Sequence, residues 1–251
     1  MKRDFVCDWD GATFATERLG FQPDAKQRIV LDDQIRRGVL NCSRQWGKST
    51  VSAAKAVYRA YTRPDSLVVV LSPGARQSGE FMRKAATFTK RLGIAPRGDG
   101  GNKMSLVFPH GSRIVGLPGV HETVRGFSAV SLMLIDEASR VSDELYHAVM
   151  PMLAVSNGDL WLMSTPDGQR GFFYEEWTNG GDAWVRVSAP GWECPRISTQ
   201  VLAEARASMG EQEFRQEFGC EFVDSGECLF DSETLRAAIT DDVRPLDLRR
   251  R

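Results

Sequence analysis

Residues 47–50 are a glycine, a lysine and two hydroxyl side chains, and residues 41–50 as a whole suit the binding of a nucleoside triphosphate. They lie between an apolar run at 38–40 and a segment predicted to be a helix. A tight turn between a strand and a helix directs backbone N–H groups, and the positive end of the helix dipole, at one small volume. Lys48 would reach the β- and γ-phosphates there, and the Ser49 hydroxyl would bind Mg²⁺. Cys42 replaces the usual first glycine of such a loop, so an ordinary loop that carries this short motif by chance is the alternative.

An acidic pair follows a second apolar run. Residues 131–135 are typical of a strand that is buried on both faces of a parallel sheet, and Asp136 and Glu137 come directly after them. An acidic residue at the carboxyl end of a central strand lies beside the phosphate loop in open α/β sheets. Asp136 could then hold the Mg²⁺ shell, and Glu137 could orient and polarise the attacking water. The alternative, that the pair only caps a following helix, is disfavoured by the lysine motif upstream.

Hydroxyl side chains end a third apolar run, at 160–163, which is followed by Ser164, Thr165 and Pro166. Hydroxyls on a neighbouring strand could hydrogen-bond the γ-phosphate or the attacking water. Residues 164–168 are also rich in turn formers, so ordinary turn chemistry explains them equally well.

The elements that would position these residues alternate between strands and helices. We expect strands at 38–42, 67–71, 105–108, 112–117, 131–135, 159–163 and 184–188, and helices at 24–37, 50–61, 75–92, 142–150 and 199–218. The strands at 105–108 and 112–117 are expected to form a hairpin. This alternation predicts an α/β fold, and the final third is expected to form a small subdomain packed on the sheet.

Composition agrees with a globular α/β enzyme domain. The chain has 251 residues, 42% of them hydrophobic, and a formal net charge of −1. No apolar run approaches the length that spans a membrane. The net charge does not mark a nucleic-acid binder, although basic residues cluster at Arg76, Arg83, Lys84, Lys90 and Arg91 and at 249–251. A solvated helix face is the favoured interpretation of the first cluster, and contact with DNA phosphates is the alternative.

Residues 41–50, 134–138 and 164–166 together resemble the ATPase domain of large terminase subunits, the DNA-packaging motors of tailed bacteriophages. That family's phosphate loop typically lacks the first glycine, so Cys42 agrees with it. The resemblance covers roughly residues 20–222 and implies a P-loop NTPase of the ASCE type, which has an extra central strand and a catalytic glutamate. It implies a mainly parallel central sheet flanked by helices and a small C-terminal lid-like subdomain, with boundaries expected at 1–188 for the core and 189–251 for the lid, linker and tail.

The resemblance also implies roles for individual residues. Gln27 would read the adenine, Glu137 would be the catalytic base, and either Arg44 in its own subunit or Arg125 in a neighbouring one would stabilise the transition state. Arg140 is a weaker third candidate. The expected nucleotide contacts are Gln27, Ser43, Arg44, Gln45, Trp46, Gly47, Lys48, Ser49 and Thr50. The expected metal ligands are Ser49 and Asp136, and the expected coupling residues are Ser164, Thr165 and Pro166.

The implied function is ATP hydrolysis with Mg²⁺ that drives double-stranded DNA into a procapsid in the host cytoplasm. The implied partners are the portal protein, the small terminase subunit and further copies of the chain in a ring, although the isolated chain could be monomeric. The resemblance ends near residues 222–226, and the remainder is too short for the family's nuclease domain, so we expect no DNA cutting. The rival interpretations are a helicase-like translocase and a nucleotide-dependent assembly switch with little turnover.

Overall fold

A seven-stranded sheet forms the centre of the computed structural model, which describes residues 9–100, 104–119, 126–223, 234 and 237–238. The strand order is β3-β4-β2-β5-β6-β1-β7. Only the β3–β4 pair is antiparallel among the described pairs, so the expected mainly parallel sheet and its hairpin are confirmed. The strands are β1 (Arg37–Cys42), β2 (Leu67–Ser72), β3 (Ser105–Val107), β4 (Arg113–Pro118), β5 (Leu132–Asp136), β6 (Asp159–Ser164) and β7 (Val185–Ala189).

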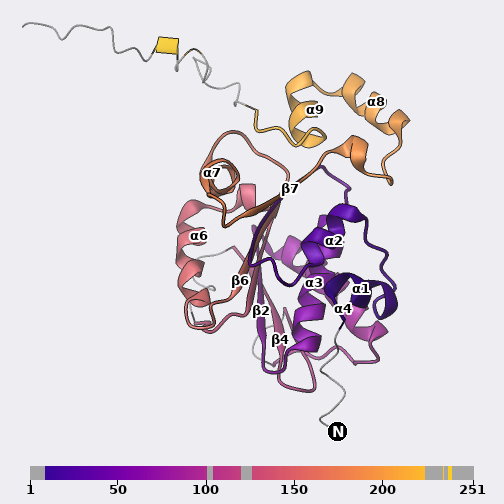
Figure 1. The fold of residues 1–251 in the computed structure, drawn as a ribbon, viewed down its shortest axis with the longest axis vertical. Coiled ribbons are helices and arrows are strands. Elements are labelled where there is room, and N and C mark those ends of the chain that lie inside the picture. The colour runs from indigo at the N-terminus through magenta and orange to yellow at the C-terminus, as the bar shows by residue number, and fades with distance from the viewer. Residues whose placement is uncertain (1–8, 101–103, 120–125, 224–233, 235–236, 239–251) are drawn as a thin grey trace, which may run out of the picture.

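Helices cover both faces of the sheet (Figure 1). One face carries α1 (Gly11–Glu17), α2 (Ala25–Leu31), α3 (Lys48–Thr62) and α4 (Ala75–Arg91), and the other carries α6 (Asp143–Val149) and α7 (Gly171–Asn179). A pair of short helices, α8 (Thr199–Ser208) and α9 (Glu211–Glu217), lies beyond the end of the sheet near β7. Short 3₁₀ helices are η1 (Ala138–Arg140), η2 (Met150–Leu153) and η3 (Gly191–Glu193).

The apolar strands separate two cores because successive side chains point to opposite faces of a sheet. In β2, Val68 and Val70 pack with α3 and α4, whereas Val69 and Leu71 pack with α6 and α7. All six residues of β2 are buried. Burial on both faces explains why β2, β5 and β6 contain continuous apolar runs in the sequence.

The strand order brings together the ends of the three strands that carry polar residues. β6 lies between β1 and β5, and the register pairs Asn41 with Ser164 and Asp136 with Met163. The carboxyl ends of these parallel strands therefore meet at one edge of the sheet. The inserted strand β6 is the extra central strand that the sequence resemblance implied.

Two predicted helices differ from the structure. The helix expected at 24–37 ends at Leu31, because Asp32 leaves the helical region (ψ 124°) and its side chain accepts a hydrogen bond from the backbone of Gln34 at 2.9 Å. The helix expected at 199–218 is divided into α8 and α9, since Met209 is extended and Gly210 caps the second helix. The strands begin and end within a residue or two of the expected positions.

Within the described part of the chain, no helix is both long and apolar enough to cross a membrane.

Candidate nucleotide site

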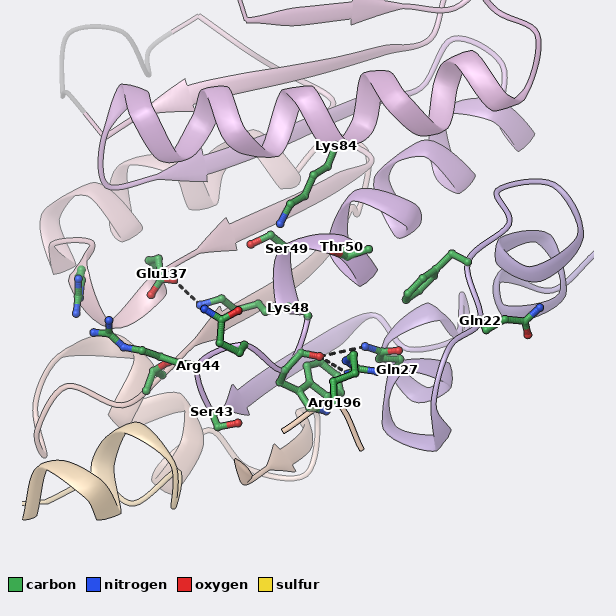
Figure 2. A pocket seen from close by; sticks show the side chains of 16 residues that line it. Gln22, Gln27, Ser43, Arg44, Lys48, Ser49, Thr50, Lys84, Glu137 and Arg196 are labelled. Carbon is green, nitrogen blue, oxygen red and sulfur yellow. Dashed lines mark hydrogen bonds and ion pairs between the residues drawn. The ribbon is translucent and has the colours of Figure 1, made fainter. Parts of the chain in front are cut away.

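A cavity of about 630 Å³ opens at the carboxyl ends of β1, β5 and β6 (Figure 2). Its wall contains the whole predicted phosphate loop from Ser43 to Thr50, together with Gln27, Glu137 and Thr165. The structure therefore brings residues from four separate predicted segments around one space. The cavity is also lined by Phe21, Gln22, Lys84, Arg140 and Arg196.

The phosphate loop turns sharply from β1 into α3. Gly47 stands before the first helical residue with a φ of 101°, a left-handed conformation that glycine adopts without a steric penalty. Trp46 anchors the loop, because it is 1% exposed and packs in the core. The 15-residue helix α3 begins at Lys48, so the free N–H groups of its first turn and its positive dipole end adjoin the cavity.

Cys42 is a core residue at the start of this loop. Its side chain is fully buried, and burial raises the pKa of the thiol to about 12. The thiol therefore stays protonated at neutral pH and packs where a glycine stands in the common form of the loop.

Lys48 pairs with the acidic residues that follow β5. Its Nζ lies 2.6 Å from Oε1 of Glu137 and 4.0 Å from Oδ1 of Asp136. Burial opposes the charged form of Lys48, but these carboxylates outweigh that effect and raise its pKa. The lysine is therefore a fixed positive charge in the floor of the cavity.

The residues expected to bind a metal suit Mg²⁺. Oδ1 of Asp136 is buried and has no hydrogen-bond partner in the described structure, although such a buried oxygen normally has one. Asp136, Ser49 and Glu137 also line a second cavity of about 330 Å³ that adjoins the first. Burial raises the pKa of Asp136, and the charge of Lys48 opposes this rise. The described residues contain no group of three or more metal-binding side chains, so waters and phosphate oxygens would complete the shell of a hard cation such as Mg²⁺.

Glu137 has an unusual backbone conformation between β5 and η1. Its φ and ψ are 54° and 46°, in the left-handed region that costs a residue with a side chain free energy. The carboxylate of Glu137 lies in the cavity wall, beside Lys48 (Figure 2). The strained turn thus directs the carboxylate toward the triphosphate space.

Ser164 and Thr165 connect the acidic segment to the phosphate loop. Oγ of Ser139, two residues after Glu137, lies 2.7 Å from Oγ of Ser164 and donates to the carbonyl of Thr165 at 2.9 Å. The hydroxyl of Thr165 donates to the carbonyl of Cys42 at 3.1 Å. Thr165 also lines the cavity, whereas Ser164 and Pro166 are buried. The hydroxyls of Ser164 and Thr165 thus connect the segment after Glu137 to the start of the phosphate loop.

The candidate arginines have different positions. Arg44 lines the cavity, but its guanidinium is bound to the carboxylate of Glu217 in α9, with Nη2 3.0 Å from Oε1. Arg140 lines the same cavity, in η1. Arg125 lies outside the described residues.

At the opposite end of the cavity, Gln27 is almost fully buried. Its side-chain oxygen accepts from the backbone of Asp24 at 3.0 Å, and its nitrogen donates to the carbonyl of Trp46 at 3.4 Å. Arg196 donates to the same carbonyl, and its Nη2 lies 3.3 Å from Oδ2 of Asp24. Gln27 is therefore part of the framework that ties α2 to the phosphate loop at the end where a base would lie.

Sequence reasoning misses two basic residues of this cavity, Lys84 and Arg196. The sequence groups Lys84 with the exposed cations of its helix, and Arg196 stands alone in an irregular segment. Neither lies in a motif, so only the tertiary structure places them at the site.

Comparison with known proteins identifies the family of this chain. Residues 39–237 match a family described as "Terminase large subunit, T4likevirus-type, N-terminal". The large terminase subunits of Thermus phage G20c and Thermus virus P23-45 are each 25% identical over 250 residues, which covers 85% of this chain and 51% of theirs. The chain thus spans about half the length of these curated relatives.

Solved structures show the same fold. The large terminase ATPase domain of Thermus phage P74-26 superposes with a TM-score of 0.75 at 22% identity, over 86% of this chain and 100% of that domain. The large terminase of another thermophilic bacteriophage, solved in complex with ADP, superposes with a TM-score of 0.68 at 15% identity, over 80% of this chain and 54% of that one.

Proposed function

Because the chain belongs to the family of T4-like large terminase subunits and matches their N-terminal part, we propose that it is the ATP-hydrolysing motor of a DNA-packaging terminase. The observation that carries this proposal is the convergence of Lys48, Asp136 and Glu137 at the end of the phosphate loop. The ADP complex of the large terminase from the second thermophilic phage supports a nucleotide as the ligand.

In this proposal the triphosphate lies along the cavity, with its base toward Gln27 and its γ-phosphate toward Glu137. The N–H groups of the loop and the Nζ of Lys48 bind the phosphates. Ser49 and Asp136 would hold Mg²⁺, which when bound would neutralise phosphate charge. Oδ1 of Asp136, which has no hydrogen-bond partner among the described residues, and the protonated Lys48 provide the matching charges.

Hydrolysis requires Glu137 to exchange its partner. As the phosphates bind Lys48, they compete with the Lys48–Glu137 contact and free the carboxylate to orient a water. The water oxygen bonds to the γ-phosphorus while Glu137 takes a water proton, and the bond from that phosphorus to the β–γ bridging oxygen breaks. ADP and inorganic phosphate are the products. Arg44 in the same site, or Arg125 from a neighbouring copy, would stabilise the charge that develops on the phosphate oxygens.

The hydroxyls at the end of β6 would relay this change. Ser164 and Thr165 connect the segment after Glu137 to the phosphate loop, and the loop contacts α9 through Arg44. We propose that residues 1–188 are the motor core and that the segment from 189 onward is a lid that moves with nucleotide state. Movement of the lid would drive double-stranded DNA into a procapsid, by a ring of copies acting with the portal protein and the small terminase subunit in the host cytoplasm.

The test is to measure ATP binding and phosphate production separately for the wild type and for Glu137→Gln. Binding in both, with turnover only in the wild type, would support the motor. ATP binding with no turnover in the wild type, even with procapsids and DNA present, would favour the assembly switch. If single-stranded nucleic acid, without procapsids, stimulated ATP turnover as strongly as the packaging components do, the helicase-like alternative would be favoured.

A further inference from the structure

We propose that Lys84 of α4 is a second lysine for the terminal phosphate, so that the site distinguishes ATP from ADP through α4 as well as through the phosphate loop. The inference rests on the proposed function, because it assumes that a nucleotide occupies the cavity. It adds a residue that lies in neither the phosphate loop nor the acidic segment.

The position of Lys84 on its helix separates it from the other basic residues of α4. Arg76, Arg83 and Lys90 are exposed, whereas Lys84 is half-buried and precedes the buried Ala85. Figure 2 shows its side chain extending from α4 toward Ser49 and the phosphate loop. Its ammonium therefore faces the site, not the solvent around the helix.

Two cavities meet at Lys84. The larger cavity and the adjoining one of about 330 Å³ share Ser49, Lys84 and Glu137 as lining residues. Glu137 and Gln27 lie at opposite ends of the larger cavity, on either side of Lys48 (Figure 2). Since the base would lie at the Gln27 end, the junction of the cavities is the place where the terminal phosphate would lie.

The charge of Lys84 has no close partner. Among the described residues, its Nζ has no carboxylate within 4.0 Å and no hydrogen bond, whereas Lys26, Lys48 and Lys55 each have at least one such contact. Lys84 and Asp136 both line the smaller cavity. A half-buried, unpaired ammonium beside a metal-binding carboxylate is suited to a phosphate oxygen, because charge-assisted hydrogen bonds are the strong ones.

The terminal phosphate is the group that ADP lacks, so the proposal predicts a change in selectivity. Lys84→Gln removes the charge and keeps most of the side-chain length. We expect it to weaken the binding of the slowly hydrolysed analogue ATPγS by about tenfold or more while the affinity for ADP stays within about twofold of the wild type. Lys84→Arg should restore part of the loss. Lys90→Gln, which removes one charge from the exposed end of the same helix, should leave both affinities unchanged.

Both affinities are to be measured by calorimetry with Mg²⁺ present, on variants whose circular dichroism and melting temperature match the wild type. An unchanged ratio of ATPγS to ADP affinity in Lys84→Gln would overturn the inference, as would an equal loss for both nucleotides. If the wild type bound neither nucleotide, the proposed function would fail instead. If the wild type bound both nucleotides and Lys84→Gln had the same ratio of ATPγS to ADP affinity, only the inference about Lys84 would be overturned.

Discussion

Arg44 in the phosphate loop is joined to Glu217 in α9 through both side chain and backbone. Its Nη2 lies 3.0 Å from Oε1 of Glu217, and its backbone N–H donates to the Glu217 carbonyl at 3.2 Å. The hydrogen bond to Glu217 is the main cause that raises the pKa of Arg44. In this structure α9 thus holds the arginine that lies closest in sequence to Lys48, and an arginine held there is not free to contact a phosphate.

Releasing Arg44 should therefore change turnover. We expect Glu217→Gln to raise the basal ATPase rate, by at most about fivefold, because an ion pair with a half-exposed partner is worth about 1 kcal/mol or less. Glu213→Gln, an exposed carboxylate one turn earlier in α9, is the matched control; its charge acts on Arg44 only weakly, so its effect should be clearly smaller. Steady-state phosphate release at several protein concentrations is the measurement. A fall in rate would show that the pair is needed for the active geometry and does not restrain it.

The contact between Lys48 and Glu137 gives a second prediction. Glu137→Gln should lower the turnover number by about 100-fold or more, because a positioned general base contributes that much to the rate. ATP affinity should be retained or slightly increased, since the neutral amide competes less well with phosphate for Lys48. Single-turnover hydrolysis and equilibrium binding separate the two effects. A Glu137→Gln variant that lost ATP binding together with turnover would contradict the assignment of Glu137 as the base. Glu175→Gln, in the exposed part of α7, is the control for the loss of one charge.

Replacing the carboxylate of Asp136 by an amide should act through the metal. Loss of an outer-shell partner of a metal ligand alone costs about tenfold or more in affinity, so Asp136→Asn should raise the Mg²⁺ concentration for half-maximal ATPase activity by at least about tenfold. Titration of Mg²⁺ at saturating ATP would reveal this shift, and a chelator should abolish the activity of the wild type. An unchanged Mg²⁺ requirement in the variant would place the metal elsewhere.

The fold was largely predictable because its central strands β2, β5 and β6 are buried on both faces. Continuous apolar runs such as 67–71 leave no competing periodicity, and each is followed by turn formers or by the polar residues of the site. The errors are at helix ends and in two short helices, α1 and α7, that were not predicted. Asp32 stops α2 by bonding to the backbone, and Gly210 divides the last predicted helix, so in both cases a local polar or glycine effect overrode a helical pattern.

The candidate site was predictable only where its residues lie in contiguous motifs. Lys48 and Asp136 follow directly from the segments that carry them, and the strand order brings those segments together. Glu217 lies 173 residues from Arg44, and Lys84 lies on the flank of a helix, so their places in the site depend on how the helices pack on the sheet. A pattern of residue types along the chain carries no information about such contacts.

Lys55, in the middle of α3, gives a prediction about stability. Lys55 is 1% exposed, and its Nζ donates to the Asp32 carbonyl at 2.9 Å and lies 5.1 Å from the ring centre of Trp161. Burial lowers the pKa of Lys55 from 10.5 to about 8. Between about pH 8 and 10.5 the unfolded chain keeps a proton that the folded protein has lost, so the free energy of unfolding gains a contribution that rises with pH.

The full shift corresponds to about 3 kcal/mol. The stability of Lys55→Met relative to the wild type should therefore be greatest near pH 7 and should fall by up to that amount by pH 10.5. Denaturant unfolding of both proteins at several pH values measures the difference and cancels the groups they share. The exposed Lys90→Met should show no such slope. Parallel pH profiles for Lys55→Met and the wild type would mean that Lys55 keeps its proton in the folded state, held by the acidic residues around it.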